Sequence, residues 1–240
     1  MSKPTKPSVF KSPDGKIPRL YAIIDPLQTN GRSSLAVAAE LLAAGVRLIQ
    51  LRDKHASSGE LYSSAEQIAQ IVRTAGGIFI INDRADVTRA MDGDGVHVGQ
   101  DDLPVDSARN LLGQDKIIGY STHVMDQVRE ADLTSADYIA FGPIFPTGSK
   151  ENPDAVVGLE GLREARKLTR KPLVAIGGIT LENASSVIEA GADSVAVIRA
   201  LVGAPDIRQR AEELLQQVSG VRKRKSRRVK GEKSGGKSKI

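Results

Sequence analysis

Residues 172–200 read PLVAIGGITLENASSVIEAGADSVAVIRA, and this stretch contains the unit from which the chain is built. PLVAIGG (172–178) and SVAVI (194–198) are short apolar runs of the kind that form strands buried on both faces. LENASSVIEAG lies between them, begins with polar residues and ends at a glycine, as helices commonly do. The stretch therefore predicts a strand, a helix and a second strand parallel to the first.

The same unit recurs along the chain. The segment SSLAVAAELLAAG is a second predicted helix with a serine start and a glycine stop, whereas the helices after residues 82 and 121 are predicted to be short. Six further apolar runs are RLYAIID (19–25), VRLIQLR (46–52), IFIIN (78–82), GVHVG (95–99), IIGYS (117–121) and YIAFGPI (138–144). Eight strands alternating with helices favour closure into a barrel, and no G-x-G-x-x-G opens the first helix as a dinucleotide-binding sheet would require. We expect an α/β protein with a single (β/α)₈ domain, the TIM-barrel architecture, over residues 19–218.

Composition narrows the classes of function. Cysteine is absent, which excludes disulfides, thiol catalysis and cysteine-bound metals. No apolar run approaches the roughly 18 residues that span a bilayer, and the polar residues 1–18 do not resemble a signal peptide. We therefore expect a cytoplasmic protein without a membrane partner, and the sequence leaves a homo-oligomer open.

The basic character of the chain is confined to one end. Residues 221–240 hold ten Lys or Arg and one Glu, so most of the formal charge of +5 belongs to this tail and the remainder is mildly acidic. We expect residues 219–240 to be disordered and solvated without a specific partner. The alternative is a nucleic-acid-binding tail, whose binding would be sensitive to salt and lost on deletion of residues 221–240.

Active sites of such barrels lie at the carboxyl ends of the strands, and polar residues of this sequence cluster there. Leu48, Gln50, Arg52 and Lys54 alternate with Ile49, Leu51 and Asp53, so they are predicted to share one face of the second strand. If that face lines the barrel mouth, Arg52 and Lys54 can bind phosphate oxygens there. The alternative is a strand end with solvated charges.

The third and fourth strands are followed by acidic residues. Asn82 and Asp83 end the third strand, and Asp102 follows the fourth. Two carboxylates at neighbouring strand ends are a plausible Mg²⁺ site, since Mg²⁺ takes one or two carboxylates and completes its shell with water and phosphate oxygens. The alternatives are that Asp83 caps the next helix and that Asp102 sits in a turn before Pro104.

The later strand ends carry hydroxyls, a lysine and glycines. Ser121 ends the fifth strand and precedes His123, which we expect to hydrogen-bond rather than to transfer protons. The long loop after the sixth strand carries Thr147, Ser149 and Lys150 and suggests a lid or an anion site. Two anion sites are thus predicted: one for a group such as diphosphate at Arg52, Lys54, Lys150 and a metal, and one for a monophosphate at the backbone amides near Gly178, Ile198 and Arg199. For the glycine pair at 177 and 178, the alternative is tight packing.

Seven motifs in this order resemble the thiamine-phosphate synthase family: QLRDK, IIND, GVHVGQDDLP, GYSTH, GPIFPTGSK, AIGGIT and GADSVAVIRAL, within about residues 19–202. The resemblance implies a transferase that joins 4-amino-5-hydroxymethyl-2-methylpyrimidine diphosphate to a thiazole phosphate, with or without an extra carboxylate, and releases diphosphate. It implies Mg²⁺ at Asp83 and Asp102 and the diphosphate at Arg52, Lys54, Ser121 and Lys150. It further implies the pyrimidine at Gln50 and Asn82, the thiazole at Thr147 and Ser149, and the thiazole phosphate at amides near Gly178, Ile198 and Arg199.

The sequence departs from the family pattern at three positions. Ser149 stands where threonine is usual, Asp53 replaces a glutamate, and Arg199 replaces a frequent serine, which puts the side-chain contact at position 199 in doubt. The nearest rival is the thiazole tautomerase, an isomerase that would use His123 for proton transfer. That enzyme typically lacks the full set of polar strand-end residues found here, so the synthase is favoured.

Overall fold

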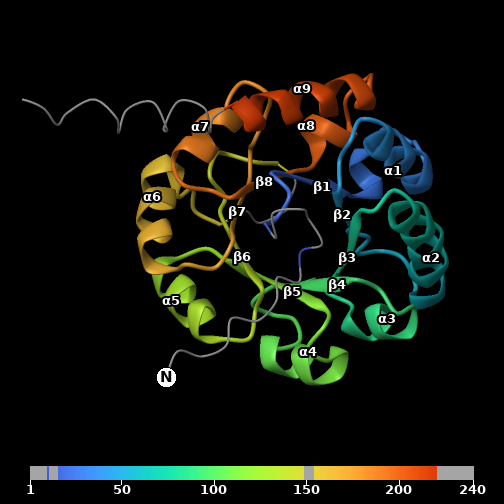
Figure 1. Ribbon diagram of the computed structural model, residues 1–240, viewed down its shortest axis with the longest axis horizontal. Helices are drawn as coiled ribbons and strands as arrows, with labels where there is room; N and C mark the ends of the chain where they lie inside the picture. The colour runs from blue at the N-terminus through green and yellow to red at the C-terminus, as the bar shows by residue number, and fades with distance from the viewer. Residues whose placement is uncertain (1–9, 11–15, 149–153, 221–240) are drawn as a thin grey trace, which may run out of the picture.

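The computed structural model describes Phe10 and residues 16–148 and 154–220. Within these ranges eight parallel strands pair in sequence order and close into a barrel, with helices around the outside (Figure 1). The strands are β1 (Leu20–Ile24), β2 (Leu48–Leu51), β3 (Ile78–Asn82), β4 (Gly95–Val98), β5 (Ile117–Thr122), β6 (Tyr138–Phe141), β7 (Leu173–Ile176) and β8 (Ser194–Val197). The helices are η1 (Pro26–Gln28), α1 (Ser34–Ala43), α2 (Ser58–Thr74), α3 (Ala85–Ala90), α4 (Val105–Leu112), α5 (Met125–Leu133), α6 (Gly158–Leu168), α7 (Ala184–Glu189), α8 (Arg199–Val202) and α9 (Ile207–Gly220). The predicted (β/α)₈ fold is confirmed.

Local sequence explains where most helices begin. Ser33 accepts a hydrogen bond from the Ala36 amide and starts α1, and Ser57 and Glu60 form a reciprocal capping box at the start of α2. The expectation of a similar start for α7 is wrong, because Asn183 precedes it without a capping bond and binds the Thr180 amide instead. None of the helices in the described ranges is long and apolar enough to cross a membrane.

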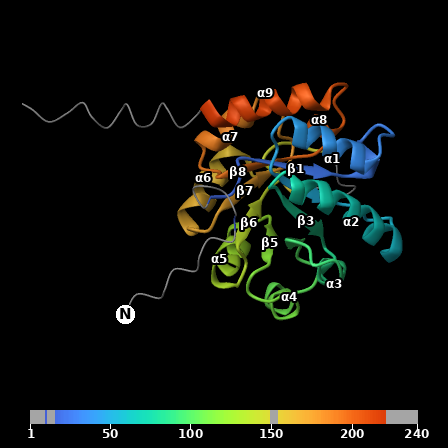
Figure 2. The same cartoon turned by 45° about the vertical axis from the view of Figure 1, so that its right-hand side comes forward.

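The last described helix lies beside the first strand and the first α-helix of the barrel. Helix α9 packs against α1 and β1, and Figure 2 shows α8, α9 and α1 close together at one side of the barrel. The Arg19 guanidinium donates to the Val218 carbonyl at 2.5 Å, which joins the residue before β1 to the last turn of α9. The two ends of the described barrel are therefore held next to each other.

Side chains alternate along each strand between two apolar cores. Ile49 and Leu51 of β2 point outward and pack in the layer between strands and helices. Tyr21, Leu48 and Ile80 belong instead to the core inside the barrel. The polar residues of the mouth lie directly beyond this inner core, toward the carboxyl ends of the strands.

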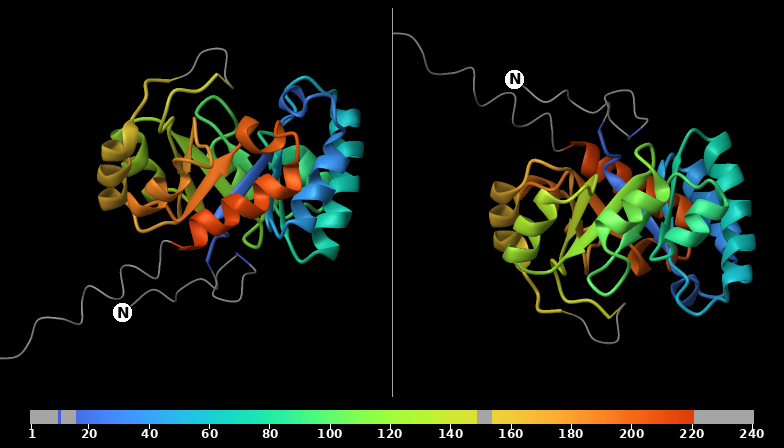
Figure 3. Two further views of the ribbon diagram at one scale, coloured as in Figure 1. Left: turned by 90° about the horizontal axis from the view of Figure 1, so that it is seen from above. Right: turned by 90° about the horizontal axis from the view of Figure 1, so that it is seen from below.

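The amino end of the barrel is covered by the chain that leads into β1. Phe10 is only 4% exposed and its ring centroid lies 6.3 Å from that of Tyr138, so Phe10 forms part of the inner core. Figure 3 shows the chain that leads into β1 (blue) and the loop after β6 (yellow) at opposite ends of the barrel. Phe10 lies in the segment that was expected to be only a polar extension, and it closes the barrel opposite the mouth.

Phe10→Ala is expected to lower the free energy of unfolding by about 3 kcal/mol, because it removes a buried ring and leaves a cavity under Tyr138. Urea denaturation of the full chain would measure the loss. Leu27→Ala is the matched control, since Leu27 is 70% exposed and its truncation should change stability little. Equal effects of the two substitutions would show that Phe10 contributes nothing to the core.

Three aspartates fasten neighbouring strands at the amino end. Asp94, Asp137 and Asp193 each stand just before an even-numbered strand. Their carboxylates accept hydrogen bonds from the amides of Phe79 at 3.0 Å, Ile118 at 2.8 Å and Leu173 at 3.0 Å, respectively. Each partner amide lies in the preceding odd-numbered strand. These contacts, the aspartate clasps, join β3 to β4, β5 to β6 and β7 to β8.

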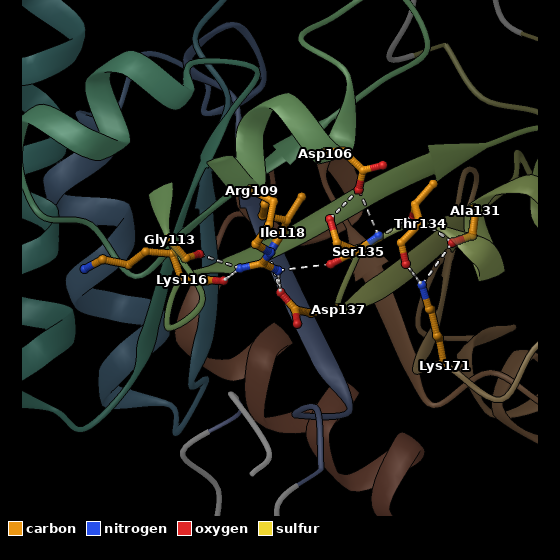
Figure 4. A network of polar contacts seen from close by, with 11 residues as sticks. Asp106, Arg109, Gly113, Lys116, Ile118, Ala131, Thr134, Ser135, Asp137 and Lys171 are labelled. Atoms are coloured by element: carbon orange, nitrogen blue, oxygen red, sulfur yellow. Dashed lines mark hydrogen bonds and ion pairs between the residues drawn. The ribbon is translucent and has the colours of Figure 1, made fainter. Parts of the chain in front are cut away.

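The middle clasp is reinforced by a buried arginine (Figure 4). Arg109 of α4 is 4% exposed and its guanidinium lies 2.5 Å from Asp137. The same guanidinium donates to the carbonyls of Gly113 at 2.9 Å, Lys116 at 2.6 Å and Ser135 at 3.0 Å. Because a buried charge needs a counter-ion and hydrogen bonds, loss of any one of these partners is expected to destabilise the protein.

Candidate active site

The polar face predicted for β2 does line the barrel mouth. Leu48 belongs to the inner core, and Gln50, two residues on, is buried inside the barrel with its Nε2 donating to the Tyr21 hydroxyl at 2.6 Å. Arg52 and Lys54 continue the column beyond the end of the strand, where exposure increases. The structure thus brings this column to the carboxyl ends of the strands, where barrels bind their ligands.

Arg52 is held by an acidic residue that the sequence interpretation did not single out. Its Nη1 forms an ion pair with Oδ2 of Asp25, which follows β1, and the side chains are 19% and 6% exposed. The other carboxylate oxygen of Asp25 accepts from the Leu27 amide at 3.0 Å at the start of η1. Arg52 is therefore fixed by the first strand and does not contact the predicted metal pair.

Lys54, Asp83 and Asp102 converge as the sequence predicted. Lys54 Nζ lies 3.3 Å from Asp83 Oδ2, and the Asp83 carboxyl is within hydrogen-bonding reach of Asp102. Burial, followed by the neighbouring Asp102, raises the pKa of Asp83 to about 6, and Lys54 opposes this shift. A cation beside these two neighbouring carboxylates would offset their negative charge. Asn82 precedes Asp83 and is half-buried at the end of β3.

The backbone at Asp83 is unusual for a non-glycine residue. Its φ is +63°, in the left-handed region, and its amide donates to the His97 carbonyl at 2.8 Å. Helix α3 begins after Arg84 without a side-chain cap, so the alternative in which Asp83 caps that helix is wrong. Asp102 does take part in its loop, because its Oδ2 accepts from the Gly99 amide at 2.7 Å.

Ser121 lies near the end of β5, at the mouth, and contacts β4 and the loop that follows it. Its hydroxyl is 2.8 Å from His97 Nε2, and its carbonyl accepts from Gln100 Nε2 at 2.6 Å. His97 lies on β4 and Gln100 in the following loop, so β4 and β5 are tied together at the mouth. Ser121 is also part of the cavity wall.

The cavity has a volume of about 210 Å³ and lies over the ends of β5 to β8. Of the predicted residues, Ser121, Thr147, Gly178, Ile198 and Arg199 line it. Arg199 reaches toward the loop after β6, since its Nη1 would lie 3.8 Å from a Cβ built on Gly148. Ser149 and Lys150 lie outside the described residues, as does the middle of the predicted lid, and so does the basic tail from residue 221 on. The structure thus groups the residues predicted for the second anion site.

The glycine pair borders the cavity and also packs tightly against the loop after β6. Gly177 and Gly178 have φ values of +99° and +63°, and both border the cavity. A Cβ at Gly178 would lie 2.6 Å from the Pro146 carbonyl oxygen, so only glycine lets the loop after β6 approach this closely. Tight packing is therefore part of the explanation for this pair.

His123 also borders the cavity. Its Nδ1 lies 2.7 Å from the Gly142 carbonyl oxygen and 3.4 Å from Asp154 Oδ2. The carbonyl contact requires a proton on Nδ1, which makes His123 a hydrogen-bond donor to the loop after β6. This matches the expectation of a hydrogen-bonding histidine.

Four residues near the site were missed from sequence: Asp25, His97, Gln100 and Asp154. Asp25 directly follows the first strand, just as Asp83 directly follows the third, so the same pattern could have marked it as a site residue. The alternation within GVHVG could have placed His97 inside the barrel. No comparable signal marks Gln100 or Asp154, whose positions depend on how their loops fold.

A closed (β/α)₈ barrel with cations, paired carboxylates and a cavity at its carboxyl end has the architecture of the barrel enzymes, whose active sites lie at that end. The model of a family described as thiamine monophosphate synthase matches residues 20–201. By this match and the relatives below, the chain belongs to the thiamine monophosphate synthase family.

Two relatives carry the name of this family, and both of them and one solved structure match this chain over nearly their whole length. The thiamine-phosphate synthase of Koribacter versatilis (strain Ellin345) is 52% identical over 205 residues, which cover 84% of this chain and 96% of that protein. The thiamine-phosphate synthase of Moorella thermoacetica is 44% identical over 203 residues, covering 85% and 97%. A solved structure of thiamine phosphate pyrophosphorylase from Pyrococcus furiosus has a TM-score of 0.78 and 36% identity, covering 85% of this chain and 96% of that one.

Proposed function

We propose that the chain is a thiamine-phosphate synthase, a transferase that joins 4-amino-5-hydroxymethyl-2-methylpyrimidine diphosphate to 4-methyl-5-(2-phosphooxyethyl)thiazole, or to its carboxylated form, and releases diphosphate. The observation that carries the proposal is that a cation–carboxylate cluster and a cavity, whose wall includes Ser121, lie at the same end of one barrel. The cluster suits a diphosphate and the cavity suits a small phosphorylated ring. The names and matched lengths of the relatives support it.

The roles follow the chemistry of each side chain. Arg52, Lys54 and Ser121 would bind the diphosphate oxygens together with Lys150. Gln50 and Asn82 would hold the pyrimidine. Thr147 and Ser149 would face the thiazole, and the backbone near Gly178, Ile198 and Arg199 would bind its phosphate.

The donor set at Asp83 and Asp102 fits Mg²⁺. Both ligands are carboxylate oxygens, and two of them are enough when substrate phosphates and water supply the rest of the shell. Among the described residues no group of three or more His, Cys, Asp or Glu is placed to hold a metal by protein ligands alone. Bound Mg²⁺ would offset the negative charge that gathers on the departing diphosphate.

The protein's own part in the reaction is positioning. As the carbon–oxygen bond to diphosphate breaks, Arg52, Lys54 and Ser121 stabilise the leaving group while Gln50 and Asn82 hold the pyrimidine, whose methylene becomes electron-poor. The thiazole nitrogen, held in the cavity, then forms the new carbon–nitrogen bond. A protein nucleophile is not needed. The same proposal places the enzyme in the cytoplasm, with small-molecule substrates as its partners.

The proposal is tested by incubating the full chain with the two phosphorylated precursors and measuring thiamine phosphate, with Mg²⁺ and then with excess EDTA. Product is expected with Mg²⁺ and its formation should fall to background with EDTA, then recover when Mg²⁺ is restored. Folded protein that forms no product under any of these conditions would refute the synthase function. Exchange of thiazole tautomers by the same protein would then point to the tautomerase.

Asp25→Asn is expected to lower kcat/KM by up to about 10²-fold, because Arg52 loses the counter-ion that fixes it over the diphosphate. Asparagine keeps an oxygen for the Leu27 amide, so the start of η1 and the stability should be preserved. Steady-state kinetics would show the loss mainly as a higher KM for the pyrimidine diphosphate. An unchanged KM would mean that Arg52 is placed without Asp25.

A further inference from the structure

A chain of five polar side chains crosses the interior of the barrel. Gln50 Nε2 donates to the Tyr21 hydroxyl at 2.6 Å, and the Tyr21 and Tyr138 hydroxyl oxygens are 2.9 Å apart. The Tyr138 hydroxyl is 2.9 Å from His97 Nδ1, and His97 Nε2 is 2.8 Å from Ser121 Oγ. These residues come from β2, β1, β6, β4 and β5, so the chain, here termed the interior relay, connects opposite walls of the barrel.

The interior relay is shielded from solvent along most of its length. Tyr21 is 1% exposed and Tyr138 is fully buried, while Gln50 and His97 are also buried. The His97 ring stacks on the Tyr138 ring with centroids 5.5 Å apart. Burial is the largest cause of the raised pKa of both Tyr21 and Tyr138. Each phenol hydroxyl therefore keeps its proton and can donate it in a hydrogen bond.

A glycine makes room for the central contact. A Cβ added to Gly119 of β5 would lie 2.0 Å from Tyr138 Cζ and 2.5 Å from His97 Nδ1. Any side chain at position 119 would therefore separate the tyrosine from the histidine. The backbone of β5 is shaped to let these two groups meet directly beneath Ser121.

One direction of hydrogen bonding is consistent with Gln50 Nε2 as the donor at the Tyr21 end. The Gln50 amide nitrogen can only donate, so Tyr21 accepts from it and directs its own proton to Tyr138. Tyr138 then donates to His97 Nδ1, which leaves the imidazole proton on Nε2, where it is donated to Ser121. The Ser121 oxygen therefore accepts the hydrogen bond from His97, and the Ser121 hydroxyl proton is free to be donated to a group outside the relay. At the opposite end, Gln50 keeps its carbonyl oxygen as an acceptor.

We propose that Tyr21, Tyr138 and His97 are positioning residues that make Ser121 a donor toward the diphosphate and Gln50 an acceptor toward the pyrimidine amino group. The proposal rests on the proposed function for the identity of the two ligand groups. A diphosphate oxygen carries negative charge and requires a donor, and an aromatic amine requires an acceptor. The interior relay fixes both orientations before substrate binds, so neither hydroxyl nor amide has to reorient during the reaction.

The orientation itself is tested by ¹⁵N NMR of histidine-labelled protein. We expect His97 to carry its proton on Nε2 in the wild-type chain and to lose this single tautomer in Tyr138→Phe. Gly119→Ala should have the same effect, because it separates the two rings. A wild-type His97 with its proton on Nδ1 would overturn the proposed direction. This measurement does not depend on any enzyme activity.

The positioning role is tested by a double-mutant cycle. Tyr138→Phe should lower kcat/KM about 10-fold in the wild-type chain and have no further effect in Ser121→Ala, since it acts through Ser121. Tyr21→Phe, at the next joint, is the second variant if Tyr138→Phe folds poorly. Thr122→Val is the matched control, because the Thr122 hydroxyl is buried and bonded to the Ala140 carbonyl outside the relay.

The outcomes separate the two proposals. A wild-type chain without synthase activity would overturn the proposed function whatever the tautomer of His97. An active chain in which Tyr138→Phe and Ser121→Ala have independent effects would overturn the positioning role alone. A loss in Thr122→Val equal to that in Tyr138→Phe would also overturn it, because the effect would then be one of general packing.

Discussion

Asp83→Asn is expected to lower thiamine phosphate formation by a factor of about 10² to 10³. The substitution keeps the size of the side chain but removes one of the two charges that would bind Mg²⁺ and the partner of Lys54. Asparagine also tolerates the left-handed backbone that Asp83 adopts, whereas alanine would add strain at φ +63°. The Asn variant therefore isolates the effect of charge from that of backbone geometry.

The measurement for Asp83 combines kinetics with metal binding. kcat/KM at saturating Mg²⁺ reports the reaction, and titration with Mn²⁺ in the presence of diphosphate reports the ion itself. Asp86→Asn is the control, since Asp86 is an exposed acid of α3 that pairs with Arg84 at 2.6 Å. Wild-type rates and wild-type Mn²⁺ binding in Asp83→Asn would mean that the carboxylate pair does not hold the metal.

Asp137→Ala is expected to lower the free energy of unfolding by about 3 to 5 kcal/mol. Arg109 would remain buried without its counter-ion, and the Ile118 amide would lose its acceptor. Because this contact lies at the amino end of the barrel, kcat per folded molecule should not change. Urea denaturation followed by circular dichroism would give the stability, and assays of the native fraction would give kcat.

Asp126→Ala provides the comparison for Asp137. Asp126 also pairs with an arginine at 2.5 Å, but its side chain is 85% exposed and Arg129 is 57% exposed. An exposed pair of this kind contributes about 0 to 1 kcal/mol. An equal loss of unfolding free energy in Asp126→Ala and Asp137→Ala would contradict the prediction that the buried ion pair of Arg109 contributes more to stability than the exposed one.

The sequence pattern was enough to predict the barrel and which polar side chains meet at its mouth. Alternation in β2 placed Gln50, Arg52 and Lys54 on the inner face, because the two-residue period of a strand does not depend on its neighbours. Adjacency of strand ends predicted that Asp83 would meet Asp102, because consecutive strands of a barrel are also neighbours in space. Both inferences use only order along the chain.

The interior relay and the covering of the amino end could not be predicted in this way. Tyr21 meets Tyr138 across the barrel, and the two strands are not adjacent, so their contact depends on the diameter and stagger of the closed sheet. Phe10 lies in a polar stretch without periodicity, so no pattern marked it as buried. The left-handed backbone of Asp83 could not be predicted either, because it accompanies a hydrogen bond from the Asp83 amide to the His97 carbonyl on the neighbouring strand.

The aspartate clasps divide the barrel into modules of two strands. Each clasp joins an odd-numbered strand to the next one, so β3–β4, β5–β6 and β7–β8 are each fastened within one continuous segment. The two ends of the described barrel already lie together through Arg19 and Val218. A circular permutant opened between β4 and β5, or between β6 and β7, would keep every clasp inside an unbroken segment, whereas one opened between Phe79 and Asp94 would have to form its clasp between the two new ends of the chain.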